Sequence, residues 1–196
     1  MILGQINIGS PAGEVIRKIS SREDVDTIVE IGTWNGAGST RCVIDALRTN
    51  TKAKFYSLEC NKGQFELAKL NNPNLSNLPN VNLIFGRIVN EEDLDILNLN
   101  QEEVGFLAQD VQAMRGCSNV IELLPSSICF LILDGGEFST QAEFKKLIER
   151  TNFIFLDDTR VRKNKKNRQH LIESDEFIVL EDHLNDRNGW SLFKRK

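Results

Sequence analysis

The sequence predicts an α/β protein built on a doubly wound, mostly parallel sheet. Short apolar runs rich in β-branched and aromatic residues alternate with stretches in which apolar residues recur at helical spacing. The runs are nearly continuously apolar, as expected of parallel strands covered by helices on both faces. The last two runs are separated by a short turn containing Asn-Gly, which is typical of an antiparallel hairpin. We therefore expect right-handed crossovers and one antiparallel strand near the sheet edge.

The predicted elements follow one another without an internal repeat or a flexible linker. The parallel strands are expected at 27–32, 54–59, 81–86, 128–135 and 152–158, and the hairpin at 177–186 and 189–195. Helical spacing appears at 39–50, 61–71, 117–124 and 139–150, the last behind a capping box formed by Thr140 and Glu143. Two further segments are an N-terminal helical segment, 1–24, and a polar, partly helical insertion, 90–116.

Composition limits the classes of protein to which the chain can belong. Its 196 residues, 40% hydrophobic and 27% charged, suit one globular domain over 1–196. The net charge of −4 gives no general attraction to nucleic acid or to an anionic membrane. No apolar run approaches the roughly 20 residues that span a bilayer, and the start has no basic leader. We expect a cytoplasmic protein, and buried reduced thiols rather than zinc ligands or disulfides for its four cysteines, which form no C-x-x-C pair.

The stretch IVEIGTWNGAGST, residues 28–40, turns from an apolar strand into a glycine-rich loop. Gly32, Gly36 and Gly38 leave room for a ligand to approach the backbone, and Ser39 opens a helix whose free N–H groups can bind polar ligand atoms. A tight turn that only packs helix on strand is the alternative. The spacing excludes a Walker A loop, which needs a lysine, and a G-x-G-x-x-G loop, which needs glycine where Trp34 stands.

Acidic residues end three of the other predicted strands. Glu59 can hold the two hydroxyls of a ribose, or it can cap the helix that begins near Asn61. Asp134 ends the fourth strand, and Asp157 with Asp158 ends the fifth. If these strands are neighbours, three carboxylates meet and repel one another unless a cation or basic side chains intervene. Mg²⁺ prefers such oxygen ligands, whereas helix capping or ion pairs with Arg160 and Arg162 would need no metal.

The motifs EIGTWNGAGST and FYSLE, together with the terminal hairpin, resemble class I S-adenosylmethionine-dependent methyltransferases from about residue 25 onward. The resemblance implies a Rossmann-like sheet of seven strands, S-adenosylmethionine as cofactor and a ribose held by Glu59. It further implies that Glu30, Gly32 and Gly36 line the methionine part of the cofactor. Thr33, Trp34, Gly38 and Ser39 of the same loop are expected to contact it as well, although Trp34 could instead pack against the next helix. Relatives often place an acid near the adenine after the third strand, where this chain has Gly86-Arg87-Ile88.

The resemblance is sharper for the metal-dependent O-methyltransferases. In that branch an Asp after the fourth strand and an Asp-Asp or Asp-Asn pair after the fifth hold a divalent cation, which matches Asp134, Asp157 and Asp158. It implies catalytic roles for Asp134 and Asp157, with Glu137 standing where many relatives have a histidine that serves as base. A bound cation would orient and acidify an acceptor hydroxyl. A metal-independent methyltransferase, a nucleotide-binding oxidoreductase and a non-catalytic domain are the alternatives.

Six of the nine residues in RVRKNKKNR, 160–168, are basic. The segment can be a solvated helix, or it can select an anionic small molecule such as a phosphorylated sugar. No interleaved aromatic residues favour single-stranded nucleic acid, so nucleic acid is not expected as a partner. The expected acceptor is a small hydroxylated molecule, and the sequence leaves a homo-oligomer open.

Overall fold

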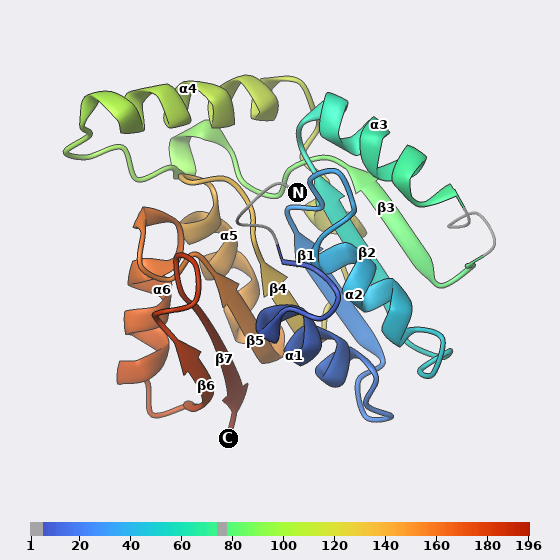
Figure 1. The fold of residues 1–196 in the computed structure, drawn as a ribbon. Helices are drawn as coiled ribbons and strands as arrows, with labels where there is room; N and C mark the ends of the chain where they lie inside the picture. Colours follow the sequence, from blue (N-terminus) through green and yellow to red (C-terminus); the bar gives the residue numbers. More distant parts are fainter. Residues whose placement is uncertain (1–5, 74–77) are drawn as a thin grey trace.

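A computed structural model describes residues 6–73 and 78–196. Its seven strands form one sheet in the order β3-β2-β1-β4-β5-β7-β6, which confirms the predicted fold class (Figure 1). Neighbouring strands are parallel from β3 to β5, whereas β7 pairs antiparallel with both β5 and β6. The strands are β1 (Thr27–Ile31), β2 (Lys54–Glu59), β3 (Val81–Phe85), β4 (Ile128–Leu133), β5 (Thr151–Asp157), β6 (Phe177–His183) and β7 (Trp190–Arg195).

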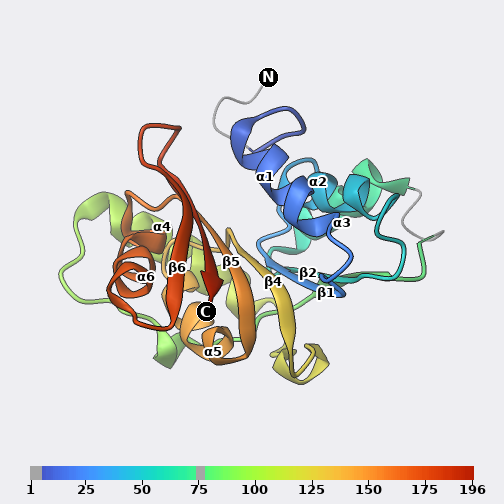
Figure 2. The ribbon, with the colours of Figure 1, turned by 90° about the horizontal axis from the view of Figure 1, so that it is seen from below.

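Helices cover both faces of the sheet (Figure 2). Successive side chains along a strand therefore point alternately into two apolar cores. Ile28, Phe130 and Phe155 belong to the core under the first helices, and Val29 and Leu131 belong to the opposite one. The first face carries α1 (Pro11–Ser20), α2 (Ser39–Ala46) and α3 (Lys62–Asn71), and the second carries α4 (Gln101–Arg115), α5 (Thr140–Leu147) and α6 (Arg162–Glu173).

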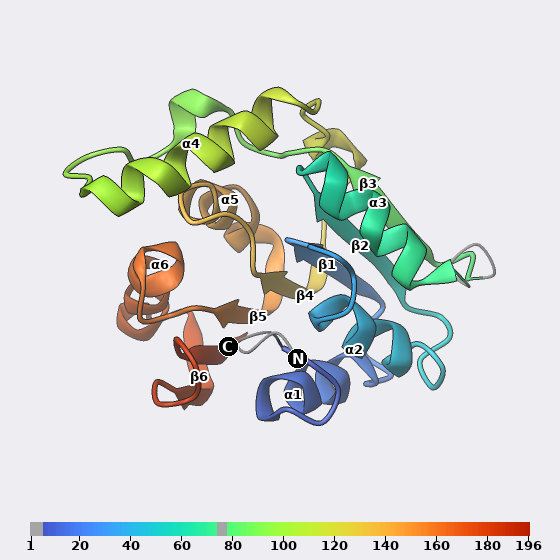
Figure 3. The ribbon, with the colours of Figure 1, turned by 45° about the horizontal axis from the view of Figure 1, so that its top comes forward.

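Helix α4 corrects the expected division of the crossover between β3 and β4. The predicted helix at 117–124 is wrong, because there the chain forms only a 3-10 turn, Ile121–Leu123, after a bridge between Arg87 and Asn119. The predicted insertion, 90–116, contains the crossover helix itself. Asn100 and Glu103 form a capping box that begins this helix. Figure 3 shows α4 running across one end of the sheet.

The start of α5 also differs from its prediction. The capping box expected at Thr140 and Glu143 is wrong, because the N-cap residue is Ser139. The Thr140 hydroxyl donates instead to the Gly136 carbonyl over 2.7 Å. Glu143 is therefore free of a capping role, and its side chain lies buried beside the carboxyl ends of the strands.

The strand order reverses between β1 and β4, at the centre of the sheet. At that point the Asp134 amide donates to the Ile31 carbonyl over 2.9 Å, so the loops after β1 and β4 start in contact. Such a switch point is where open α/β sheets bind ligands. Within 6–73 and 78–196, none of the helices has the length and apolar character needed to cross a membrane. All four cysteines are free thiols; Cys42 is buried as expected, whereas Cys60, Cys117 and Cys129 are only partly buried.

Candidate functional site

The glycine-rich turn after β1 is shaped by close packing. Gly32 and Gly36 have φ angles of 97° and 71°, in the region that favours glycine. A Cβ on Gly32 would lie 2.1 Å from the Asp134 carbonyl oxygen, and one on Gly36 would lie 2.6 Å from the Asn72 side chain. Packing alone thus accounts for these two glycines, as in the alternative given above. Their contact with a cofactor stays a prediction.

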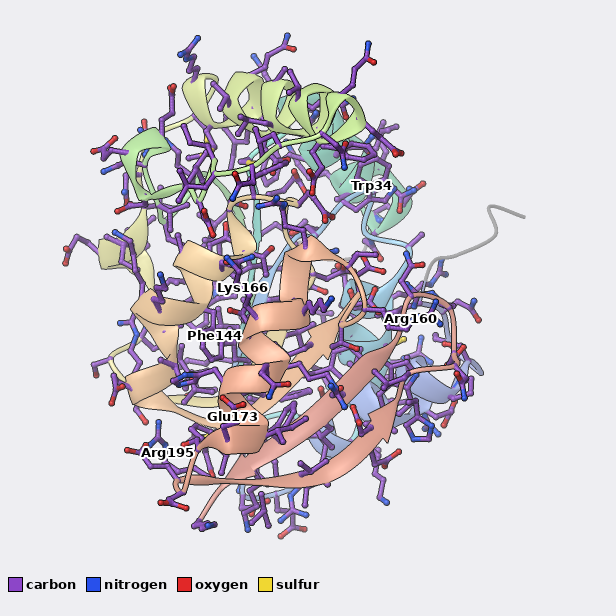
Figure 4. All side chains as sticks on the ribbon, turned by 90° about the vertical axis from the view of Figure 1, so that its left-hand side faces the viewer. Trp34, Phe144, Arg160, Lys166, Glu173 and Arg195 are labelled. Carbon is purple, nitrogen blue, oxygen red and sulfur yellow. The ribbon has the colours of Figure 1, made fainter. Side chains whose placement is uncertain are left out.

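Two cavities open on either side of this turn and share Gly32, Trp34, Asp134 and Gly135. We call them the β2-side cavity and the β5-side cavity. The β2-side cavity is also lined by Glu59, Arg87, Asp110, Met114 and Glu143. The β5-side cavity is also lined by Ile6, Thr33, Gly38, Ser39, Asp157, Asp158, Lys163 and Arg187. Trp34, 49% exposed and at a φ of 52°, lies between the two cavities and is labelled in Figure 4.

Glu30 lies beneath the turn and lines neither cavity. Its Oε2 accepts hydrogen bonds from the hydroxyls of Thr40, at 2.7 Å, and Ser57, at 2.5 Å. Its Oε1 has no partner among the described residues. Complete burial raises the pKa of the Glu30 carboxyl to about 7, although the hydroxyl donors oppose this shift. Direct contact between Glu30 and a cofactor stays a prediction.

Glu59 lines the β2-side cavity at the end of β2. Its Oε2 accepts from the Trp34 amide over 2.7 Å, and its Oε1 accepts from the Asn61 amide over 2.8 Å. The carboxylate therefore ties the glycine-rich turn to the start of α3, and burial raises its pKa. Capping and ribose binding are compatible, because each carboxylate oxygen has two lone pairs. The ribose role stays a prediction.

Two acidic residues in the β2-side cavity were missed by the sequence analysis. Asp110 of α4 accepts from the Phe138 amide over 2.8 Å, and burial raises its pKa. Glu143 of α5 is fully buried with no partner for Oε2 among the described residues, and burial raises its pKa to about 8. Helical spacing gives no signal for either residue, since their role depends on how α4 and α5 cross the sheet edge. Arg87 shares the cavity, but its guanidinium donates to the carbonyls of Met114 and Val89.

Asp134, Asp157 and Asp158 come together as the sequence predicts. Each offers one carboxylate oxygen, and these three atoms lie within 4.8 Å of one another. Asp134 and Asp157 follow adjacent parallel strands, and Asp158 points into the same space from a backbone with a φ of 56°. Such a group of oxygens has the ligand chemistry that a hard divalent cation needs.

Two basic side chains that the sequence analysis did not assign to the site already neutralise this cluster. Lys163 Nζ donates to Asp134 Oδ1 and to Asp158 Oδ2, the second over 2.9 Å. Arg187 Nη2 donates to Asp157 Oδ2 over 2.7 Å. Burial disfavours the ammonium of Lys163, but the three carboxylates outweigh burial and raise its pKa.

Burial, the neighbouring acids and the two cations together set the pKa of each carboxyl in the cluster. Burial and the charges of Asp134 and Asp158 raise the pKa of Asp157 to about 7. Burial would also raise the pKa of Asp158, but the charge and hydrogen bond of Lys163, with Asn188 and Arg187, outweigh burial and lower that pKa. The alternative of ion pairs is thus realised, with Lys163 and Arg187 in place of the expected Arg160 and Arg162.

Comparison with solved structures identifies the architecture. No family model and no curated protein matches the sequence. A methyltransferase from Geobacter sulfurreducens superposes with a TM-score of 0.63 at 13% identity, over 96% of this chain and 80% of that one. An O-methyltransferase from Bacillus cereus in complex with SAH gives 0.63 at 15% identity, over 95% and 82%. TomG from Streptomyces achromogenes, an O-methyltransferase in complex with SAM, gives 0.63 at 11% identity, over 97% and 82%.

This chain has the class I methyltransferase fold. The resemblance inferred from the sequence is confirmed at the level of fold, including the seven strands and the antiparallel β7. Glu137 lines neither cavity, and its Oε1 accepts from the Lys163 amide over 3.1 Å. Its role as base stays a prediction.

The basic segment 160–168 is largely occupied by ion pairs within the fold. Arg162 pairs with Glu103, Lys166 with Asp95 and Arg168 with Asp182. Figure 4 shows Arg160 beside the hairpin loop and Lys166 away from it on α6, and Arg160 donates to the Leu184 carbonyl. Lys163, already described, is the member of the segment that reaches the site. Most of these charges therefore stabilise α6 against its neighbours.

Proposed function

We propose that the chain is an S-adenosylmethionine-dependent methyltransferase that methylates an oxygen of a small hydroxylated acceptor. The fold supports this proposal, and so do the SAH and SAM held by two of the similar O-methyltransferases. The observation that carries it is the β2-side cavity, where Glu59 at the end of β2 faces the glycine-rich turn and a buried, unpartnered Glu143 oxygen.

The residues around both cavities fit the parts of the cofactor. In the β2-side cavity Glu59 can accept hydrogen bonds from ribose hydroxyls. The free Oε2 of Glu143 can accept a hydrogen bond from the adenine ring of the cofactor, or donate one to it when protonated. At the β5-side cavity Gly38 and Ser39 begin α2, whose first N–H groups have no partner within the helix and suit a carboxylate. Trp34 lines both cavities and so lies beside the middle of a ligand that spans them.

The proposed reaction needs positioning and a base. When bound, S-adenosylmethionine supplies a methyl group on a sulfonium, and the sulfur keeps the electron pair of the broken bond as the acceptor oxygen forms the new one. Asp157 lines the β5-side cavity and has a pKa of about 7, near the value suited to accepting the acceptor's hydroxyl proton. Glu137 lines neither cavity, so we favour Asp157 as the base.

The acceptor proposed here is anionic as well as hydroxylated. Arg187 lines the β5-side cavity, and its Nε and Nη1 are buried without a hydrogen-bond partner among the described residues. A negatively charged group would satisfy these donors, since a guanidinium binds carboxylate or phosphate in a forked geometry. The basic segment that first pointed to an anion contributes less, because its charges are mostly paired. The sequence leaves a homo-oligomer open, and gel filtration of the purified chain tests for it.

The divalent cation expected from the sequence competes with the ion pairs of the cluster. The spacing of Asp134, Asp157 and Asp158 suits an ion, but Lys163 holds two of these carboxylates and Arg187 holds the third. These residues do not fit a metal as they stand, because an ion could enter only by displacing Lys163. The proposed function therefore includes no metal step.

Isothermal titration calorimetry with S-adenosylhomocysteine tests the proposal. The wild-type chain should bind it, and Glu59→Gln should weaken binding about ten- to a hundred-fold, as expected for the loss of charge-assisted hydrogen bonds to a ribose. Glu66→Gln, at an exposed site on α3, is the matched control and should bind like wild type. Thermal unfolding of both variants checks that the turn remains intact.

Two outcomes would overturn this function. Binding of NAD without binding of S-adenosylhomocysteine would favour a nucleotide-binding oxidoreductase. Binding of neither would favour a non-catalytic domain that keeps the fold.

A further inference from the structure

We propose that Lys163 is a built-in cation that takes the place of a divalent metal ion in this site. A role of Lys163 in methyl transfer rests on the proposed function, whereas its exclusion of a metal ion does not. The Lys163 ammonium lies between Asp134 and Asp158, two of the three carboxylates whose oxygens gather within 4.8 Å. The side chain of Lys163 is only 9% exposed, so it belongs to the interior of the cluster.

The local fold fixes Lys163 in this position. It is the second residue of α6, which starts a few residues after β5 ends. The next residue, Asn164, is fully buried and donates to the carbonyls of Leu133, at 3.1 Å, and Asp157, at 2.6 Å. Asn164 thereby fastens the first turn of α6 to the ends of β4 and β5, and the ammonium is held where the two strands deliver their carboxylates.

Charge explains why the lysine and an ion exclude each other. Three adjacent carboxylates, of which Asp157 is buried and the other two are partly buried, need positive charge nearby, and Lys163 with Arg187 supplies it from the chain. A divalent ion would compete with Lys163 for the carboxylates of Asp134 and Asp158, and its charge would repel the buried ammonium beside them. An ammonium has three N–H donors, and two of them go to the carboxylates, which leaves one for a ligand atom in the β5-side cavity.

The same geometry predicts what the site becomes without the lysine. Removal of the ammonium leaves three oxygens within 4.8 Å and an uncompensated negative charge, which is the donor set of a divalent-ion site. The wild-type chain should be indifferent to metal, and a variant with an uncharged side chain at 163 should acquire metal binding.

Electron paramagnetic resonance of Mn²⁺ tests this inference directly. When MnCl₂ is added to the wild-type chain up to millimolar concentration, the signal of free Mn²⁺ should equal that of the same MnCl₂ concentration in buffer alone. Lys163→Met keeps the length of the stem but not the charge, and should bind Mn²⁺ at least about ten-fold more tightly. Its unfolding temperature should rise with Mn²⁺ by linkage. Lys163→Arg keeps a positive charge at this position and should not bind Mn²⁺. Lys165→Met, on the same helix, is the matched control.

Wild-type titrations decide the question even if Lys163→Met fails to fold. Tight Mn²⁺ binding by the wild-type chain that Asp157→Asn abolishes would overturn the inference. Equal Mn²⁺ affinity in wild type and a folded Lys163→Met variant would also overturn it. Calorimetry with S-adenosylhomocysteine, in EDTA and in MgCl₂, separates this result from the proposed function: absence of cofactor binding refutes the function, whereas binding that tightens with Mg²⁺ refutes the role of Lys163.

Discussion

Buried carboxylates lie on both sides of the β1–β4 switch point, but the two sides hold them differently. On the β2 side, Glu30 and Glu59 accept hydrogen bonds only from neutral donors, which are hydroxyls and backbone amides. On the β5 side, Asp134, Asp157 and Asp158 lie against the charged groups of Lys163 and Arg187. The sequence pattern places acidic residues at the strand ends on both sides, so the two sides differ in whether cationic side chains pair with them.

The difference shows which side still lacks positive charge. Burial raises the pKa of Glu30 to about 7 against hydroxyl donors, and it raises that of Glu143 to about 8 although the hydroxyl of Ser139 and the charge of Lys163 oppose the shift. On the β5 side, Lys163, Asn188 and Arg187 together outweigh burial at Asp158 and lower its pKa, whereas the pKa of Asp157 is still raised to about 7. A cationic ligand could therefore approach the carboxyls of the β2 side without displacing a side-chain cation, which it could not do beside Lys163 and Arg187. The sulfonium and amino groups of S-adenosylmethionine are consistent with that demand, whereas a metal ion beside Lys163 is not.

The largest expected effect is the pH dependence caused by Glu143 on the β2 side. Its folded pKa of about 8 lies above the ordinary value of 4.5, so the folded state holds a proton that the unfolded state releases. Stability from this group is complete below pH 4.5 and is lost as pH rises through 8. Glu143→Gln removes this titrating group. Between pH 5 and 8 the free energy of unfolding of wild type should fall by roughly 3 kcal/mol more than that of the variant.

Urea denaturation at pH 5, 6.5 and 8 measures this difference. Glu66→Gln, exposed on α3, is the control and should follow the wild-type profile. If wild type and Glu143→Gln lose the same stability between pH 5 and 8, then Glu143 is not held as a neutral acid and the contrast between the two sides fails.

A smaller effect is expected from removing a cation on the β5 side. Arg187→Ala leaves Asp157, whose side chain is 3% exposed, without its partner at 2.7 Å. Breaking such a pair is destabilising, but protonation of Asp157 limits the cost, so we expect a loss of about 2 kcal/mol at pH 7. The loss should be greater at pH 8 than at pH 5, because only the ionised carboxylate needs the arginine.

Chemical denaturation of Arg187→Ala at the two pH values measures the loss. Arg48→Ala is the control, since its pair with Asp45 is highly exposed and should contribute less than about 1 kcal/mol. A loss no greater than that of the control, at either pH, would show that the β5 side does not depend on its own cations.

The sequence predicts the sheet well because apolar periodicity is a local property. All of the expected strands form, and Asp134, Asp157 and Asp158 meet because parallel strands deliver their ends to one edge. The sequence predicts the crossover before β4 less well, since α4 is polar and its pattern resembles an insertion. Its helix is defined by the capping pair Asn100 and Glu103 rather than by an apolar stripe.

The cations of the site could not be found in the same way. Lys163 belongs to a run of basic residues, and nothing in the spacing distinguishes it from Lys165 or Lys166. The distinction comes from Asn164, whose buried amide bonds set the start of α6. Arg187 reaches Asp157 from the loop of the hairpin, at a φ of 54° that a sequence pattern does not encode.

The smallest effect on stability, and a clear one on binding, is expected at Trp34, where the two sides meet. Its φ of 52° favours glycine, and its ring is half exposed, so Trp34→Gly should unfold within about 1 kcal/mol of wild type. Trp34→Ala loses the same ring but keeps a Cβ in the left-handed region, so it should be less stable than Trp34→Gly. Because the ring lines both cavities, each variant should bind S-adenosylhomocysteine about ten-fold more weakly by calorimetry. Unchanged affinity in both variants would mean that the ligand does not pass this residue and that the two cavities do not act as one site.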